Sequence, residues 1–300
     1  MEATLFTGWV YDHLKPLAQE WKVAHPAMLK AIAASKKKDD KVDARKIADL
    51  LRCNLLPECY MAPSATRELR RVLRYRHLVV RQATRIKNRI SGLLMETGTA
   101  YNKQRLHGKA YFNELLGNFP ETPASVVELL QLSRGQVELF ATIQKRLLNG
   151  LRENAQLSAR VARLQTIPGV GEILALTWAL EVGEVSRFCS IAQATSYCGL
   201  TSAQRSSADK EQRGPISKQR NKPLQTMLIE AAKLAPCYNP QLASVHERAL
   251  QRGNRNRATL AVARKLVAYL MAVDKSGKQF QLHLKGEEEP DPQLTSESYR

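Results

Sequence analysis

The first 62 residues carry an irregular pattern of apolar and polar positions that predicts a mixed α/β region. Apolar residues recur at helical spacing over 9–20 and over 43–51, so each stretch is predicted to be a helix with one apolar face. Two short segments, at 22–25 and 59–61, lie close to prolines and are predicted to be short strands.

The next hundred residues show the apolar periodicity of two long helices. Apolar residues return every three or four positions over 64–94, as in a coiled coil, and again over 125–164. A stretch rich in Gly, Asn and Pro at 98–123 separates them and is expected to be a loop. Two long helices joined by a loop predict an antiparallel hairpin over 63–165, which protrudes as an arm or serves in dimerisation. A compact bundle is the alternative.

A third unit is predicted over 166–285, with short helical stretches and a final helix around 259–273. After it, residues 286–300 are acidic, contain proline and include few apolar residues, which predicts a disordered tail. The expected fold class is therefore mainly α, with a partial α/β region at 1–62, a long helical arm and a helix-rich C-terminal domain.

The charge balance indicates a polyanionic partner. The chain has 300 residues, of which 46 are Lys or Arg and 28 are Asp or Glu, so its formal charge is +18. Such an excess favours nucleic acid. No apolar run approaches the roughly 20 residues of a membrane span, so no membrane partner is expected. The first residues lack the basic region and the small-residue cleavage site of a signal peptide.

The five cysteines are scattered and have no metal-ligand spacing, which suits a reducing cytoplasm. They are expected to be small core residues. These residues are Cys53, Cys59, Cys189, Cys198 and Cys237.

The first predicted long helix is strongly basic. Between Arg67 and Arg89 the sequence has nine Lys or Arg and one acid, Glu68. A solvated helix usually mixes charges to gain ion pairs between successive turns, so this one is expected to contact phosphates. Pairing with acids on another element is the alternative. The candidate phosphate-binding residues are Arg70, Arg74, Arg81, Arg85, Lys87 and Arg89.

A glycine-rich turn separates two predicted helices. Ile167-Pro-Gly-Val-Gly171 contains Gly169 and Gly171, which allow backbone conformations closed to other residues. The free amides at the start of the following helix would then face a phosphate, as in a helix-hairpin-helix DNA-binding element. An ordinary helix connection is the alternative.

Two carboxylates lie three residues apart at the start of a predicted helix. Asp40 and Asp43 would share one face, and two hard oxygen ligands are suited to Mg²⁺ beside phosphate oxygens. The alternative is that both acids only complement the helix dipole.

Seven motifs in order resemble the DEDD transposases of insertion sequences, over nearly the whole chain except the tail. They are MEATLFTGWVY at 1–11, AHP at 24–26, KDDKVDARKIADLL at 38–51, IPGVG at 167–171, YCGL at 197–200, SSA at 206–208 and GPISK at 214–218.

The resemblance implies a RuvC-like nuclease domain at 1–62 that holds Mg²⁺ with Glu2, Asp40 and Asp43. The first Asp of the family pattern has no counterpart here. This departure leads us to expect that the opening strands of the domain are missing from this chain. Residues 1–60 are then expected to be the least ordered folded part, because the remaining strands have an exposed edge.

The resemblance also implies a nucleophilic serine in the C-terminal domain. Ser207 aligns best with it and Ser206 is its near rival, although Ser202 and Ala208 replace the Pro and Gly of the family pattern. A serine can attack a phosphodiester and hold the DNA end covalently. The residues expected to bind the scissile backbone are Lys210, Arg213, Lys218 and Arg220.

The resemblance thus implies a transposase that cuts and rejoins DNA as a homo-oligomer, a dimer or a tetramer, with Mg²⁺ and a structured guide RNA made by its own element. A non-catalytic nucleic-acid-binding remnant is one alternative. A RuvC-like junction nuclease that uses the acids without the serine is another.

Overall fold

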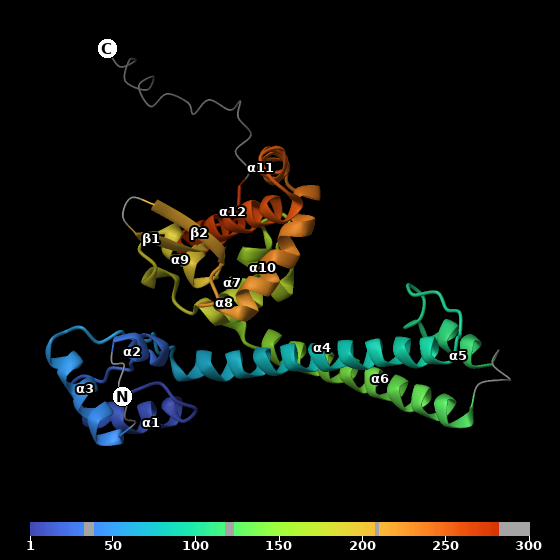
Figure 1. The fold of residues 1–300 in the computed structure, drawn as a ribbon, viewed down its shortest axis with the longest axis horizontal. Coiled ribbons are helices and arrows are strands. Elements are labelled where there is room, and N and C mark those ends of the chain that lie inside the picture. Colours follow the sequence, from blue (N-terminus) through green and yellow to red (C-terminus); the bar gives the residue numbers. More distant parts are fainter. Residues whose placement is uncertain (33–38, 118–122, 208–209, 282–300) are drawn as a thin grey trace, which may run out of the picture. The chain divides into compact units, whose positions relative to one another are not determined.

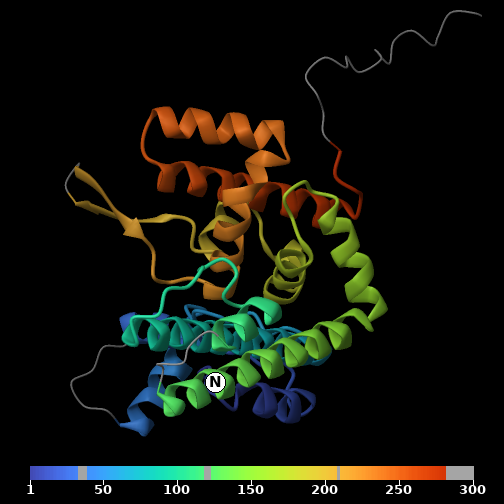
Figure 2. The same ribbon diagram turned by 90° about the vertical axis from the view of Figure 1, so that its right-hand side faces the viewer.

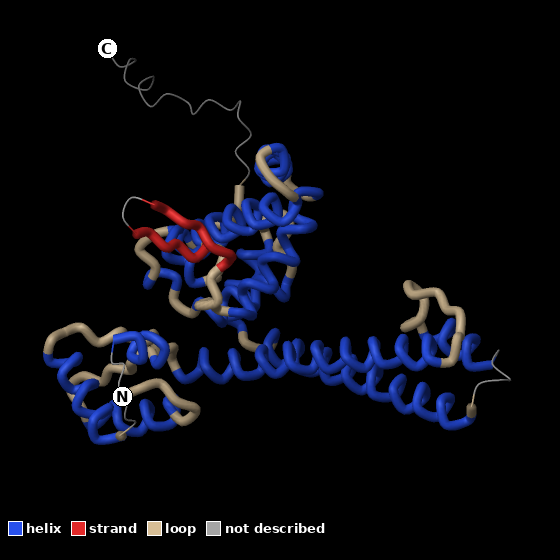
Figure 3. The backbone as a smooth tube through the Cα atoms, viewed as in Figure 1, coloured by secondary structure: helices blue, strands red, loops and turns tan. Residues whose placement is uncertain are grey.

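A computed structural model of the chain describes residues 1–32, 39–117, 123–207 and 210–281. Helices make up most of these residues (Figure 1, Figure 3), which confirms the prediction of a mainly α fold. The chain divides into two compact units, 1–147 and 148–300, and each is described here by itself. Within the described residues, no helix combines the length and the hydropathy needed to cross a membrane. The tail expected at 286–300 lies outside the described residues.

The N-terminal part of the first unit contains short helices around a small buried cluster. Its helices are α1 (Thr7–Leu14), the 3-10 turn η1 (Lys15–Leu17), α2 (Pro26–Ile32) and α3 (Asp40–Arg52). The prediction of one helix over 9–20 was wrong in extent, because Pro16 favours a 3-10 turn and the chain becomes extended at Ala18. Leu17 is 81% exposed and takes no part in a core.

The short strands expected near the N-terminus are reduced to single pairing positions. Glu2 forms a parallel bridge with Ala24, and Ala24 forms an antiparallel bridge with Glu58. The amide of Ala24 donates to the carbonyl of Met1 at 2.7 Å, and the amide of Cys59 donates to Val23 at 2.7 Å. Ala24 is fully buried, so three separate segments of the chain meet at this one residue.

Two long helices form the arm of the first unit. The first is α4 (Ser64–Glu96), as predicted, and the second begins as predicted, as α6 (Ala124–Arg152). They run side by side in opposite directions (Figure 1, Figure 2). In the sequence, α5 (Lys109–Gly117) lies between these two helices, in the stretch expected to be a loop.

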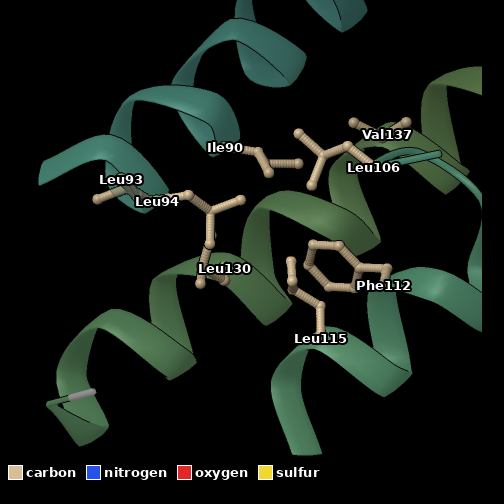
Figure 4. Packing of buried hydrophobic residues seen from close by; sticks show 8 residues of the cluster. All are labelled: Ile90, Leu93, Leu94, Leu106, Phe112, Leu115, Leu130 and Val137. Carbon is tan, nitrogen blue, oxygen red and sulfur yellow. The ribbon is translucent and has the colours of Figure 1, made fainter. Parts of the chain in front are cut away.

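A buried cluster at the α5 end of the arm explains why a helix forms there. Phe112 and Leu115 of α5 pack against the end of α4 and the start of α6 (Figure 4). The apolar residues of α5 are too few to predict a helix alone, and the neighbouring helices supply the surface that they cover. The cluster contains Ile90, Leu93, Leu94, Leu106, Phe112, Leu115, Leu130 and Val137.

The continuous helix predicted over 125–164 was wrong, because the chain breaks after Arg152. A separate helix, α7 (Ala155–Gln165), starts behind Asn154, whose side chain accepts a hydrogen bond from the amide of Leu157 at 2.9 Å. Asparagine is a strong N-cap and ends the preceding helix locally, while the apolar periodicity continues across the break. Helix α7 packs against α8 in the C-terminal unit.

The C-terminal unit is a helical domain built around one largely buried helix. Every residue of α8 from Leu174 to Val182 is buried, and α8 packs against α7 and α10. Helix α12 covers this core and also contacts α9 and α11. The elements are α8 (Glu172–Val182), η2 (Val185–Arg187), α9 (Ile191–Tyr197), α10 (Lys222–Leu234), η3 (Ala235–Cys237), α11 (Pro240–Gln251) and α12 (Arg255–Ser276).

A buried ion pair ties three of these helices together. The guanidinium of Arg160 on α7 donates to both carboxylate oxygens of Asp274 on α12, at 2.8 and 2.6 Å. The indole of Trp178 on α8 donates to the same carboxylate at 2.9 Å. Because the Asp274 side chain is only 5% exposed, these three donors replace the water that it loses on folding.

A polar β-hairpin carries the candidate serines of the C-terminal unit. Strands β1 (Ser202–Ser207) and β2 (Lys210–Ile216) pair antiparallel, with Ser202 opposite Ile216 at the base and Ser207 opposite Lys210 near the tip. The hairpin projects away from the helices of its unit (Figure 2). The sequence did not indicate this hairpin, because its strands lack the alternating apolar residues by which strands are predicted.

The expectation that all five cysteines are core residues was also wrong. Only Cys198 is fully buried, and burial raises the pKa of its thiol to about 12. Cys59 is half-buried, while Cys53, Cys189 and Cys237 are exposed.

Candidate catalytic acids and nucleic-acid interface

The two candidate aspartates lie in the first turn of α3, on the side of the helix that faces the N-terminal cluster. Ile47 and Leu50 of α3 pack against this cluster, which contains Ala24, Leu29 and Leu56. At 100° per residue, Asp40 and Asp43 fall in the same stripe, about 80° wide, as Ile47 and Leu50. Asp43 is half-buried and Asp40 is exposed.

Glu2 belongs to the same small substructure, through its backbone. It pairs with Ala24, a member of the cluster against which α3 packs, and its side chain is exposed. Among the described residues, no three His, Cys, Asp or Glu side chains come together as a metal site. Glu2 and the two aspartates therefore belong to one small substructure, but their three carboxylates do not come together as one metal site.

The basic helix α4 carries an exposed row of five arginines that we call the arginine stripe. It contains Arg71, Arg74, Arg81, Arg85 and Arg89, all exposed. By helical geometry they fall within about 80° of one another along about 27 Å of helix, and the buried apolar residues of α4 lie on the other side. Of the predicted phosphate-binding residues, Arg74, Arg81, Arg85 and Arg89 belong to the stripe, and Arg71 of the same basic run joins them.

Several cations of the same run, Arg74 of the stripe included, also interact within the protein. Arg67 forms an ion pair with Asp12 and donates to the carbonyl of Ala62 at 3.0 Å. Arg70 is half-buried, and so is Lys87. Lys87 lies close enough to His107 to contribute, after burial, to lowering the pKa of that imidazole. Pairing within the protein thus accounts for Arg67, and phosphate contact remains the prediction for the exposed stripe.

The glycine-rich turn connects α7 to α8, and its two glycines have different surroundings. Gly169 has φ +92°, and a Cβ atom there would lie 2.6 Å from the Cβ of Ala235. Gly171 is the N-cap of α8 with no side-chain cap, and the space in front of it is open. Glu172 follows and binds Arg152 through two hydrogen bonds of 2.6 and 2.7 Å. Packing explains Gly169, while Gly171 leaves the helix start accessible.

The predicted serines lie toward the tip of the hairpin. By backbone register Ser206 faces Glu211 and Ser207 faces Lys210. The side chains over 204–213, which include the predicted Ser206, Ser207, Lys210 and Arg213, lie outside the described part of the structure. Lys218 and Arg220 follow β2 and are exposed.

A polar network that the sequence did not indicate fixes the base of the hairpin. The side-chain Nδ2 of Asn221 donates to the buried carboxylate of Glu181 at 2.9 Å, and the hydroxyl of Tyr197 donates to the carbonyl of Glu181 at 2.9 Å. The side chain of Gln225 donates to the carbonyl of Gly199 at 2.5 Å. A charged residue inside the apolar run of α8 was the available signal, because a buried acid needs such partners.

Two family models match the chain. One, of DEDD type and described as a transposase, matches residues 1–98, which include both aspartates and the arginine stripe. The other, described as "Transposase IS116/IS110/IS902 family", matches residues 161–247, which include the glycine-rich turn and the hairpin.

Several curated proteins are similar over most of the chain. A putative transposase, y4qE, of Sinorhizobium fredii is 26% identical over 75% of this chain and 55% of its own length. A probable family 20 transposase of Pseudomonas aeruginosa is 28% identical over 91% of this chain and 82% of its own length. The transposase for insertion sequence element IS1111A of Coxiella burnetii is 28% identical over 79% of this chain and 66% of its own length. The chain therefore spans little more than half the length of the first of these relatives and about two thirds of the length of the last.

Proposed function

Because this chain belongs to the DEDD transposases of insertion sequences, we propose that it cuts and rejoins DNA as an oligomer, with a divalent metal and a structured guide RNA. The observation that best supports the proposal is the placement of the two candidate groups. The aspartates lie on the inward face of α3, in the region of the first family match. The serines lie on a projecting hairpin, in the region of the second.

The aspartates are the proposed metal ligands. Asp40 and Asp43 offer hard carboxylate oxygens from one face of α3, and Glu2 is the proposed third ligand. This donor set suits Mg²⁺, which takes few protein carboxylates and retains room for phosphate oxygens. When bound, the metal would stabilise the charge that develops on the phosphate during strand transfer.

The hairpin serine is the proposed nucleophile, with Ser207 first and Ser206 as its rival. Its hydroxyl oxygen would form a bond to the scissile phosphorus as the bond to one deoxyribose oxygen breaks, and the released oxygen would take up a proton. The proposal includes Lys210, Arg213, Lys218 and Arg220 as cations beside the scissile backbone. A covalent protein–DNA end would then preserve the bond energy for rejoining.

The arginine stripe is the proposed surface for a nucleic-acid backbone, DNA or guide RNA. Replacing Arg74, Arg81 and Arg85 with Ala removes three exposed cations from one row. The slope of log affinity against log salt on duplex DNA should then become shallower by about 2.7, or about 0.9 per lost phosphate contact. A filter-binding titration measures this slope, and an unchanged slope on both DNA and RNA would exclude the stripe as a binding surface.

A DNA-cutting assay tests the catalytic part of the proposal. The full chain is incubated with duplexes that carry the ends of its element, with Mg²⁺ or with a chelator. Asp43→Asn should lower Mg²⁺-dependent cutting at least about 100-fold and leave binding unchanged, because an amide cannot replace a charged ligand. Asp49→Asn is the matched control, since Asp49 is exposed on the same helix and forms an ion pair with nearby Arg52. Equal cutting by both variants would contradict the proposed metal site.

A second candidate function is nucleic-acid binding without cutting. The specific observation in its favour is that the described residues assemble no group of three metal-ligating side chains. Under this alternative the wild-type chain binds DNA or RNA with a steep salt dependence and cuts neither strand at any Mg²⁺ concentration.

A further inference from the structure

We propose that a groove between the base of the hairpin and helices α11 and α12 is a second binding site for a nucleic-acid backbone. The groove encloses about 1000 Å³. It is lined by Ser202, Gly214, Pro215, Ile216, Val245, Arg248, Ala249, Arg252, Arg257, Leu260, Ala261 and Arg264. We call it the arginine groove. The inference rests on the proposed function, since it assigns a position to the nucleic acid that such a protein would bind.

The charge of the arginine groove indicates an anionic ligand. Arg248 and Arg252 come from α11, while Arg257 and Arg264 come from α12. None of the lining residues that the structure describes is acidic, and no ion pair is found for any of the four arginines in that part of the chain. Arginine stays protonated in proteins, so four like charges around one groove repel one another unless an anion lies between them.

The choice of residue indicates phosphate in particular. All four cations are arginines, whose planar guanidinium can donate two parallel hydrogen bonds to phosphate oxygens. Arg264 donates through Nε to the carbonyl of Leu200 at 2.8 Å, which leaves its other N–H groups for a ligand. Arg248 makes a longer bond, 3.3 Å, to the carbonyl of Ser244.

The apolar part of the groove favours a nucleic-acid strand over a free inorganic anion. Val245, Ala249, Leu260 and Ala261 are half-buried and lie among the arginines. A small anion would leave these residues unused. A strand offers apolar sugar surface between its phosphates, so it matches both kinds of lining residue.

The position of the groove relates it to the proposed nucleophile. Arg264 binds the residue that leads into β1, and the groove lies at the Ser202–Ile216 end of the hairpin. From Ser202 to Ser207 the strand advances by five residues, or about 17 Å. The groove and the proposed nucleophile therefore lie at the two ends of the same strand, which is about 17 Å long.

Two charge-matched double variants of the full chain test the site. Arg252→Gln with Arg257→Gln removes two lining cations that are both exposed. Lys233→Gln with Lys278→Gln removes two exposed cations of the same unit that do not line the groove. The salt slope of binding is measured with a labelled duplex DNA and, separately, with a labelled structured RNA, and thermal unfolding confirms that each variant folds.

The groove variant should have a salt slope shallower by about 1.8 on duplex DNA, for two lost contacts, while the control keeps the wild-type slope. A loss seen only with DNA assigns the groove to the DNA, and a loss seen only with RNA assigns it to the guide RNA. Arg252→Lys with Arg257→Lys retains both charges and should keep most of the slope.

Three results would overturn the inference. If the groove variant binds both nucleic acids with the wild-type slope, the groove binds neither, although the proposed function survives. An equal loss in the control would mean that net charge alone explains the effect. If the wild-type chain binds neither DNA nor RNA, the proposed function fails together with the groove.

Discussion

The N-terminal segment that carries Asp40 and Asp43 and the C-terminal unit that carries the hairpin differ in the amount of buried structure behind each candidate site. Helix α3 packs through Ile47 and Leu50 onto a cluster of three buried residues, and its surroundings are joined by single bridges at Ala24. The hairpin is anchored to a unit in which α8 is buried from Leu174 to Val182 and polar residues are paired inside the core. We therefore expect the base of the hairpin to be held rigidly by the core of its unit. The position of the two aspartates should depend more on the metal or nucleic acid bound there.

The largest expected effect concerns the ion pair inside the C-terminal unit. Asp274→Asn should lower the free energy of unfolding of that unit by about 3 kcal/mol, because Arg160 would remain largely buried without a counter-charge. Asp49→Asn removes an exposed pair in the N-terminal segment and should cost less than about 1 kcal/mol. Urea unfolding followed by circular dichroism measures both. Similar costs for the two variants would mean that the buried pair does not hold the unit together.

A smaller effect is expected at the glycine-rich turn, where two neighbouring positions give a matched pair. Gly169→Ala forces a side chain into a left-handed backbone conformation and against Ala235, and should destabilise the unit by about 2 kcal/mol. Gly171→Ala meets open space and should cost less than about 1 kcal/mol.

Nucleic-acid binding extends this comparison of the two glycines. If the start of α8 faces a phosphate, Gly171→Ala weakens DNA binding while leaving stability nearly unchanged. Loss of stability at Gly171 equal to that at Gly169 would show that both glycines serve packing alone.

The smallest expected effect is a difference in alkylation rate between two cysteines of the wild-type chain, one from each region. Burial raises the pKa of both the Cys59 and the Cys198 thiols, and Cys198 is the more deeply buried. At pH 8 Cys198 should be alkylated only when the C-terminal unit opens, whereas Cys59 should react after smaller openings near the N-terminus. Alkylation followed over time by mass spectrometry gives the order. Faster modification of Cys198 than of Cys59 would reverse our comparison of the two regions.

The sequence predicted the parts of the fold whose signals are local and repeated. Helix α4 has a regular apolar periodicity over 33 residues, and its unbalanced charge predicted a basic surface there. By contrast, α5 forms because Phe112 and Leu115 complete a cluster with α4 and α6, and this tertiary contact leaves no periodic pattern.

The hairpin and the arginine groove were missed for different reasons. The hairpin has almost no apolar residues, so no strand pattern was present in the sequence. The groove had a visible signal, since residues 248–265 include six Lys or Arg and no acid. This run spans a turn between two helices, and only the packing of α11 on α12 shows that four of its arginines surround one groove. For the acid site, the sequence predicted the aspartate pair, and the structure added that it continues the inward face of α3.

The most direct test of the account is to trap and map a covalent link between the protein and DNA. The full chain, with Mg²⁺ and a duplex that carries the ends of its element, is denatured during the reaction and digested, and DNA-linked peptides are sequenced by mass spectrometry. The account predicts a link at Ser207, or at its rival Ser206, that is absent in the corresponding Ser→Ala variant and in Asp43→Asn. Cutting that proceeds at the wild-type rate in a Ser206→Ala, Ser207→Ala double variant, with no covalent link, would contradict it and indicate a metal-dependent nuclease.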